Sequence, residues 1–206
     1  MTRPSRFVLF ASSLLLAGWA VTPAATAAAA APAATDRAQA ESQKLNAIFD
    51  EYFEEYLQQN PILATSIGDP RYNDRFVVGI SPAAMAAEEK LHRDYLARLQ
   101  TVDRAVLPAA DQVSYDIFRT GREREIEGFK FPDELIPLNQ FYSTPNSFAQ
   151  LGSGNGMQPF KTVQDYDNFL KRLDGFVAWA DQAIVNMKQG VQRGYTLPKV
   201  LAERTV

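Results

Sequence analysis

The chain has 206 residues, 46% of them hydrophobic and 22% charged, and a formal net charge of −3. This length and composition suit a globular protein of one domain, or one and a half. A mildly acidic chain with no block of Lys and Arg lacks the electrostatic footprint of a nucleic-acid-binding protein, so that class of partner is excluded. Without cysteine, the chain cannot form a disulfide, a catalytic thiolate or a cysteine-ligated metal site.

The first 27 residues have the layout of a secretory signal peptide. Arg3 and Arg6 form a positive n-region, residues 7–20 are an uncharged apolar run, and Ala25-Thr26-Ala27 is typical of a cleavage site. An uncleaved membrane anchor is the alternative, but the strongly apolar part is too short to span ~30 Å of hydrocarbon. We therefore expect residues 1–27 to be removed, the mature protein to be exported to a bacterial periplasm, and no membrane association after cleavage.

The mature chain begins with residues 28–40, which are rich in Ala and Pro and are predicted to be a disordered lead-in. Order is expected to begin near Asp36. An amphipathic helix follows, because apolar residues recur with helical spacing at Leu45, Ile48, Phe49, Tyr52, Phe53, Tyr56 and Leu57. It should end at Asn60, since the residue before a proline is biased away from the helical conformation. A short helical turn is predicted over residues 61–66.

Two further helices are predicted between residues 81 and 127. Ser81-Pro82 is a helix start, with Ser as the N-cap and Pro in the first turn. Pro108 opens the next helix, which should run to about Glu127. Its spacing predicts an inner face made of Val113, Ile117, Phe118 and Gly121.

The segment of residues 138–156 lacks helical periodicity, and we predict one long irregular loop near residues 138–160. It combines aromatic residues with side-chain amides and hydroxyls. A loop this long inside a compact domain is usually functional or disordered. Its aromatic content argues against disorder, because disordered segments are poor in aromatic residues. We therefore regard this segment as the candidate functional region.

A capping-box relative, Thr162 to Asp165, starts the clearest helix in the sequence, which should run to about Gly190. One face carries Tyr166, Phe169, Leu170, Leu173, Phe176, Val177, Ala180, Ile184, Met187 and Val191. Leu197-Pro198 starts another helix, which has no closing cap before Val206, as though the chain were cut off. No segment alternates with a period of two, so the predicted fold is all-α, with amphipathic helices packed as an irregular helical array.

Few residues offer catalytic or metal-binding chemistry. His92 is the only histidine, and Glu89-x-x-His92 is one copy of a carboxylate–histidine half-motif. Zinc sites take three or four protein ligands, so a solvated, charged helix face is the favoured interpretation. Ser143, Ser147 and Ser153 have no histidine base beside them in the sequence. We expect no catalytic residue, no metal ligand and no cofactor in this chain.

Several short stretches together resemble a known family. They are YLQQNPILATSIG at 56–68, DQVSYDIF at 111–118, PLNQ at 137–140, and Gly190-Val191 followed by GYTLP at 194–198. In this order and spacing they resemble the N-terminal part of the bacterial domain-of-unknown-function 885 family. The similarity extends from about Leu45 to Val206, which makes residues 41–206 the N-terminal helical part of a larger, incomplete domain.

The resemblance implies an exported, mostly helical protein similar to zinc metallopeptidases. In such enzymes an H-E-x-x-H-like helix binds zinc and activates water. This sequence has no such motif, so no catalytic or metal residue is carried over, and zinc is expected only in the full-length family.

The sequence supports two hypotheses. In the first, the chain is the substrate-cleft-forming portion of a metallopeptidase-like hydrolase that takes a peptide substrate. Substrate contact is then predicted for Asn139, Gln140, Tyr142, Ser143 and Asn146, because amides, hydroxyls and a phenol can hydrogen-bond a peptide backbone. Simple structural closure of the loop is the alternative for these residues. In the second hypothesis, the chain is a stand-alone periplasmic helical binding module without catalytic activity. Self-association is possible through apolar surface left uncovered.

Overall fold

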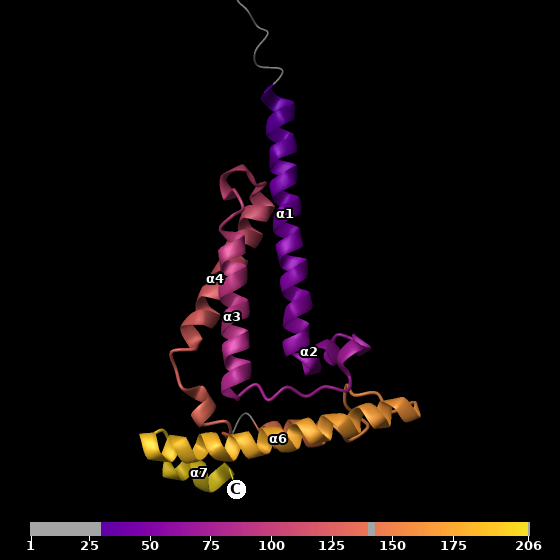
Figure 1. The fold of residues 1–206 in the computed structure, drawn as a ribbon, viewed down its shortest axis with the longest axis vertical. Coiled ribbons are helices and arrows are strands. Elements are labelled where there is room, and N and C mark those ends of the chain that lie inside the picture. Colours follow the sequence, from indigo (N-terminus) through magenta and orange to yellow (C-terminus); the bar gives the residue numbers. More distant parts are fainter. Residues whose placement is uncertain (1–29, 140–142, 206) are drawn as a thin grey trace, which may run out of the picture.

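Figure 1 shows the computed structural model of the protein, which describes residues 30–139 and 143–205. Within these ranges the chain forms seven α-helices and three 3₁₀ turns, and no strand. The predicted all-α fold is confirmed. None of the helices in these ranges is long and apolar enough to cross a membrane. The predicted signal peptide, residues 1–27, lies outside the described residues.

Three helices stand side by side and enclose the main core (Figure 1). They are α1 (Ala30–Gln59), α3 (Pro82–Leu99) and α4 (Ala109–Gly128). The turn η2 (Arg104–Val106) joins α3 to α4 and lies against α1. The buried residues of this core are Leu45, Ile48, Tyr52, Leu91, Tyr95, Leu99, Val102, Leu107 and Tyr115.

Helix α1 begins at Ala30, so residues 30–40 are helical where the sequence predicted a disordered lead-in. Alanine has the highest helix propensity, which favours extension of the helix toward the N-terminus. Two contacts also tie this part to the turn after α3. Arg37 Nη2 lies 2.6 Å from Asp103 Oδ2, and the Asp103 amide donates to Glu41 Oε2 at 2.8 Å. Residues 28 and 29 lie outside the described residues.

Most helix boundaries follow the predicted local signals. α1 ends at Gln59, and α2 (Pro61–Ser66) is the predicted short turn, followed by η1 (Pro70–Tyr72). Ser81 caps α3, where its hydroxyl accepts a hydrogen bond from the Ala84 amide at 3.2 Å. α7 (Lys199–Thr205) starts directly after Pro198, as predicted.

The predicted inner face of α4 is wrong for Val113 and Ile117 and correct for Phe118. Val113 and Ile117 are 58% and 68% exposed, whereas Tyr115 is buried. Phe118 does face inward, with its ring centroid 4.8 Å from that of Phe49 and 5.1 Å from that of Tyr52. The aromatic residues of α1 therefore select the Tyr115 and Phe118 side of α4, which buries more apolar area than the Val113 side would.

Helix α6 (Val163–Arg193) lies across the foot of the three-helix unit (Figure 1). Thr162 and Asp165 form a complete capping box at its start, and Gly194 ends it in the left-handed conformation with φ +77°. Glycine is favoured there because it adopts positive φ without steric cost. The turn η3 (Asp133–Leu135) packs against α6.

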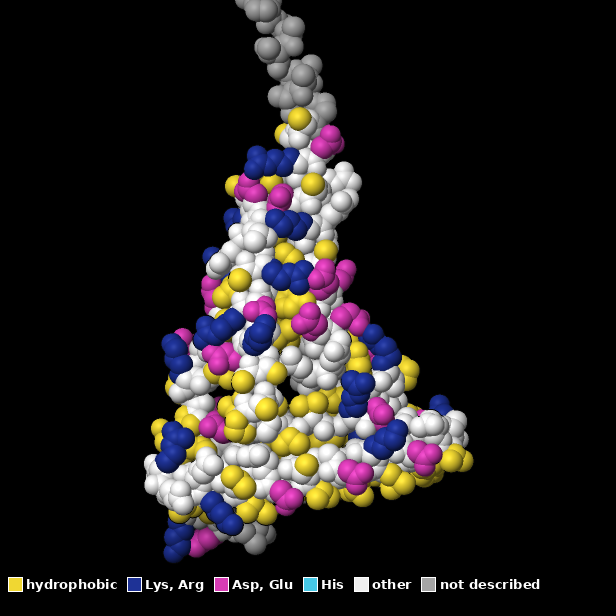
Figure 2. All heavy atoms as spheres, viewed as in Figure 1, with side chains coloured by type: hydrophobic (Ala, Val, Ile, Leu, Met, Phe, Trp, Pro, Cys, Tyr) yellow, Lys and Arg dark blue, Asp and Glu magenta, His cyan; other side chains and the backbone are white. Residues whose placement is uncertain are grey.

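Much of the predicted apolar face of α6 is exposed. The residues that are buried on this helix are Arg172, Trp179, Ala183, Asn186 and Gly190. Seven exposed apolar residues recur along one side of the helix: Val163, Tyr166, Leu170, Leu173, Val177, Ile184 and Val191. Successive members are three or four positions apart as far as Val177, and seven positions apart after it. We call these seven residues the α6 stripe. This spacing is typical of a helix that packs against another helix. Figure 2 shows apolar side chains along the lower edge of α6.

The predicted long loop is interrupted by a helix. α5 (Thr144–Leu151) lies inside the segment that the sequence predicted to be irregular from 138 to about 160. Its hydroxyl cap and two buried apolar residues, Phe148 and Leu151, explain why a helix forms there.

Candidate functional site

Helix α5 forms from strong local signals. Ser143 is the N-cap, and its hydroxyl accepts a hydrogen bond from the Asn146 amide at 3.4 Å. Pro145 lies in the first turn, where its missing N–H has no helical partner to lose. Phe148 and Leu151 are one turn apart and both buried, so they anchor one face of the helix.

Phe148 fixes α5 against α6 through aromatic packing. Its ring is nearly parallel to that of Phe176, with an interplanar angle of 6° and 4.4 Å between the ring centroids. It also stacks on the ring of Phe169, with 5.4 Å between the centroids. Phe76 meets Phe148 edge-on at 5.4 Å and 85°. Each such pair contributes about 0.5–1.5 kcal/mol beyond the area it buries. The position of α5 is therefore set by the rings of α6 and of the segment before α3.

A cavity of about 470 Å³ lies between α5, α2 and Phe76. Its apolar lining consists of Ile62, Phe76, Phe148, Leu151 and Met157, and its polar lining of Thr144, Ser147, Gln150 and Asn155. We call it the α5 cavity. Its volume is in the range of small-molecule pockets, and its walls combine apolar surface with a few polar groups, as such pockets do. No charged side chain lines it among the residues that the structure describes, so its lining suits a neutral ligand with an apolar part.

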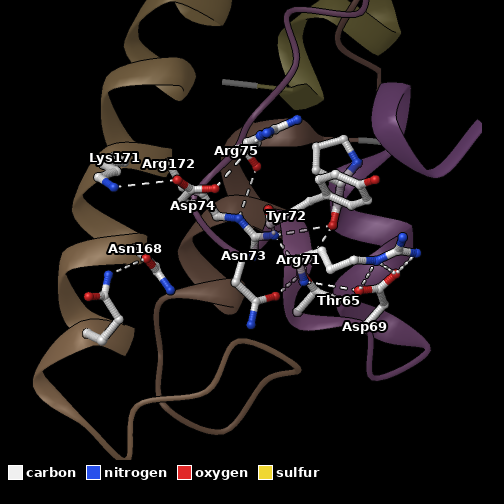
Figure 3. A network of polar contacts seen from close by, with 12 residues as sticks. Thr65, Asp69, Arg71, Tyr72, Asn73, Asp74, Arg75, Asn168, Lys171 and Arg172 are labelled. Atoms are coloured by element: carbon white, nitrogen blue, oxygen red, sulfur yellow. Dashed lines mark hydrogen bonds and ion pairs between the residues drawn. The ribbon is translucent and has the colours of Figure 1, made fainter. Parts of the chain in front are cut away.

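Arg172 lies in a network of polar contacts between α6 and the segment before α3 (Figure 3). Its side chain is fully buried and reaches from α6 into the segment that contains α2 and η1. The guanidinium donates to the carbonyl of Pro61 at 3.2 Å, to the carbonyl of Tyr72 at 3.1 Å and to Thr65 Oγ1 at 2.5 Å. It also donates to the carbonyl of Arg75 at 3.0 Å and to the side-chain oxygen of Gln158.

All five of these acceptors are uncharged. Burial lowers the pKa of Arg172 to about 10, which leaves the group a cation at neutral pH. Asp74 lies near enough to raise this pKa somewhat, but none of the described carboxylates forms an ion pair with Arg172, so the buried cation needs its hydrogen bonds fully satisfied. Because these acceptors lie on the elements that carry Ile62, Phe76 and Met157, Arg172 positions three walls of the α5 cavity at once.

The approach of Phe76 to α6 also requires a glycine. A Cβ placed on Gly175 would lie 2.8 Å from both the carbonyl oxygen and the Cβ of Phe76. Only glycine leaves space for this backbone, so Gly175 sets how closely the Phe76 wall lies to α6.

None of the predicted contact residues that the structure describes lines the cavity. Ser143 caps α5, and Asn146 is exposed on the same helix, but neither lines the cavity. Asn139 is half-buried at the end of the first described range. Gln140 and Tyr142 lie outside the described residues. Their proposed contact with substrate stays a prediction.

Sequence reasoning missed the residues that do line the cavity on α5, namely Thr144, Ser147 and Gln150. A signal for them was present. A serine followed by a proline two residues later begins a helix, and Phe148 and Leu151 are spaced as one helical face. That pattern places Thr144, Ser147 and Leu151 on adjoining turns of one surface.

The environment of His92 differs from the predicted solvated face, since its exposed fraction is 1%. Its ring lies near Tyr52 of α1 and Phe129 after α4, with centroids 6.1 and 6.3 Å away. Glu89, the predicted partner, instead pairs with Arg93 at 2.6 Å. In the described ranges no group of three or more His, Asp or Glu side chains is arranged to hold a metal ion.

The comparisons with known proteins identify the family of the chain and nothing beyond it. The family described as "Bacterial protein of unknown function (DUF885)" matches residues 61–206, which includes the α5 cavity and Arg172. No curated protein and no solved structure matches the chain.

Proposed function

The chain belongs to the bacterial family of unknown function DUF885, and from that premise we propose that it is the substrate-cleft-forming portion of an exported metallopeptidase-like hydrolase. In this proposal the α5 cavity takes an apolar side chain of a peptide, while hydroxyl and amide groups on its rim bond the peptide backbone. The zinc ligands and the catalytic base come from another part of the hydrolase, because this sequence has one histidine and no cysteine.

The α5 cavity is the observation that carries the proposal. Its rim carries the hydroxyls of Thr144 and Ser147 and the amides of Gln150 and Asn155, each of which can both donate and accept a hydrogen bond. These four groups are neutral, as are the peptide groups they would bond. The apolar walls beside them match an aliphatic side chain rather than a charged one.

Binding can be measured with the neutral peptide Ac-Gly-Leu-Gly-NH₂ and protein labelled with ¹³C in the methionine methyl groups. Met157 lines the α5 cavity, whereas Met85 and Met187 lie elsewhere and serve as internal references. We expect a saturable shift of the Met157 methyl signal only. Gln150→Ala should weaken binding about threefold to tenfold, since one neutral hydrogen bond is lost.

Gln164→Ala is the matched control, because Gln164 is exposed on α6 and bonds only Asn168, at 2.8 Å, among the described side chains. It should leave the affinity unchanged. A Met157 methyl signal that does not shift as the peptide is added would overturn the proposed role of the α5 cavity.

Export is the second component of the proposal. It is supported by residues 1–27, in which a basic segment is followed by an apolar segment and then by small residues, as in a signal peptide. N-terminal sequencing of the protein produced in a bacterial host, after separation of periplasm from cytoplasm, tests it. A periplasmic protein that starts near residue 28 is the expected result, and a cytoplasmic protein that retains Arg3 would contradict it.

The α6 stripe favours a second candidate function, a periplasmic helical module that binds another protein or a second copy of itself. Seven exposed apolar residues in helix-packing register form a surface that a partner helix could cover. Light scattering on wild type and on Leu170→Lys/Val177→Lys distinguishes the candidates. A dimer that the double variant abolishes supports the module, and a monomer in both leaves the hydrolase portion as the better account.

A further inference from the structure

A second pocket, with an acidic wall, lies at the junction of α3, α4 and the segment after α4. It has a volume of about 340 Å³. Its wall carries the carboxylates Glu88, Glu125, Asp133 and Glu134, and the aromatic residues Phe129 and Phe131. We call it the acidic pocket. It shares no lining residue with the α5 cavity, so a ligand can bind in it whether or not the α5 cavity takes a peptide.

The wall of the acidic pocket lacks cationic partners. Among the described residues, no Lys or Arg nitrogen lies within 4.0 Å of any of these four carboxylates. Other carboxylates of the chain do have such partners: Glu54 lies 2.6 Å from Arg71, and Glu89 lies 2.6 Å from Arg93.

Two further observations describe the charge of this wall. Arg122, a cation of the same region, is stacked over the ring of Tyr52, with its guanidinium carbon 4.2 Å from the ring centroid. Burial and the nearby Glu125 raise the pKa of Glu88, as expected for carboxylates without a counter-ion. The acidic pocket therefore carries carboxylates that form no ion pair with a described Lys or Arg, although Arg122 lies in the same region.

The buried histidine behind this wall is an independent observation. Neither ring nitrogen of His92 has a hydrogen-bond partner among the described residues, although both are buried. His92 does not itself line the pocket, but its Nε2 lies 4.0 Å from Oε1 of the lining residue Glu88, and its ring centroid lies 6.3 Å from that of the lining residue Phe129. Buried polar atoms are nearly always hydrogen-bonded, so the unpartnered Nε2 next to Glu88 indicates that a ligand or its hydration completes the site.

We propose that the acidic pocket binds a primary ammonium group on an apolar stem, such as a lysine side chain. The ammonium donates to the carboxylates of Glu88 and Glu125, and its third N–H is directed toward the side of the pocket where His92 lies. The stem lies against the rings of Phe129 and Phe131, which can also attract the charge through their faces. An ammonium group has three donors and no acceptor, which matches a wall of acceptors.

An organic cation fits the acidic pocket better than a bare metal ion. The volume greatly exceeds that of an ion, and a metal would leave the aromatic part of the wall without a partner. In addition, no group of three described His, Asp or Glu side chains is arranged to hold a metal.

The proposal can be tested by NMR because the chain has a single histidine, so one imidazole signal reports on the site. The probes are N-acetyl-lysine N′-methylamide and the norleucine analogue, in which a methyl group replaces the ammonium. We expect the lysine probe alone to shift the His92 signal and the Met85 methyl signal in a saturable way. Met85 lines the acidic pocket, whereas Met157 lines the α5 cavity and should stay still.

Glu125→Gln and Glu88→Gln should each weaken binding of the lysine probe about tenfold or more, since each removes a charge-assisted hydrogen bond. Glu127→Gln is the control on the same helix, because Glu127 is exposed and pairs with Lys130. Glu125 is itself exposed, so its replacement should leave the fold intact, which circular dichroism verifies.

Three results would overturn the proposal: equal shifts with the norleucine probe, unchanged affinity in both glutamine variants, or no saturable shift with the lysine probe. A titration with zinc chloride alone completes the test. Tight zinc binding that both glutamine variants abolish, without binding of the lysine probe, would replace the ammonium site with a metal site.

Discussion

Replacing Gly175 with alanine should destabilise the protein, whereas the same change at Gly121 should stabilise it. Both glycines lie inside α-helices, so alanine gains about 0.5–1 kcal/mol of helix propensity at either position. The surroundings differ. A Cβ at Gly175 would lie 2.8 Å from the carbonyl oxygen of Phe76, and a Cβ at Gly121 would meet no heavy atom within 4 Å.

The magnitude at Gly175 comes from this overlap. The ring of Phe76 packs edge-on against those of Phe148 and Phe176, so its backbone cannot withdraw without disturbing these aromatic contacts. Overpacking of this kind costs about 1–3 kcal/mol. After the gain in propensity, Gly175→Ala should lose about 1–2 kcal/mol, and Gly121→Ala should gain about 0.5–1 kcal/mol.

Urea unfolding followed by circular dichroism measures both free energies of unfolding. In thermal unfolding the two variants should move in opposite directions, by about 2–4 °C for each kcal/mol. Gly175→Ala should also shift the Met157 methyl signal, because Phe76 is a wall of the α5 cavity. A Gly175→Ala protein as stable as Gly121→Ala would refute the close packing of Phe76 on α6.

Three other outcomes are expected. Arg172→Met should lower the free energy of unfolding in urea by about 3 kcal/mol, because the carbonyl of Arg75 and the side-chain oxygen of Gln158 lose the donor that the described contacts give them. Lys171 is exposed, so Lys171→Met should change the stability little. Burial lowers the pKa of His92, so the midpoint of its NMR titration should fall below 6.5. Because the unfolded chain then binds the proton at higher pH than the folded one, the stability that this group contributes is lost as pH falls below 6.5. Thr162→Ala removes the α6 cap and should cost about 1 kcal/mol, whereas an unchanged midpoint in urea would contradict the cap.

Local signals made the helices predictable. Pro61, Ser81 and Thr162 each act within one helical turn, through a missing N–H or a hydroxyl that accepts from the backbone, so the sequence alone locates those boundaries. The same chemistry was available for α5 at Ser143. It was missed because eight residues give only two large apolar positions, Phe148 and Leu151, for a periodic pattern.

Burial was harder to predict than helix position. α6 carries apolar residues on more than half of its circumference, and the rings of Phe76 and Phe148 decide that Phe169 and Phe176 pack while the α6 stripe stays exposed. No pattern within α6 contains that information.

Arg172 and His92 show the same limit for polar residues. The acceptor Thr65 lies 107 positions before Arg172 in the chain, and His92 is covered by rings from two other helical segments. A single charged or titratable residue on a helix is predicted to be solvated unless its distant partners are known. The two polar features that organise this molecule were therefore not accessible from the sequence.

Cross-linking tests the central claim, a peptide-binding role for the α5 cavity, most directly. The peptide Ac-Gly-Leu-Gly-NH₂ is made with a photoreactive leucine, irradiated with the protein and mapped by mass spectrometry. The account predicts cross-links to Met157 and Ile62 in the cavity wall, reduced by excess unmodified peptide. Cross-links confined to Leu170 and Val177 of the α6 stripe, with none in the cavity, would contradict it.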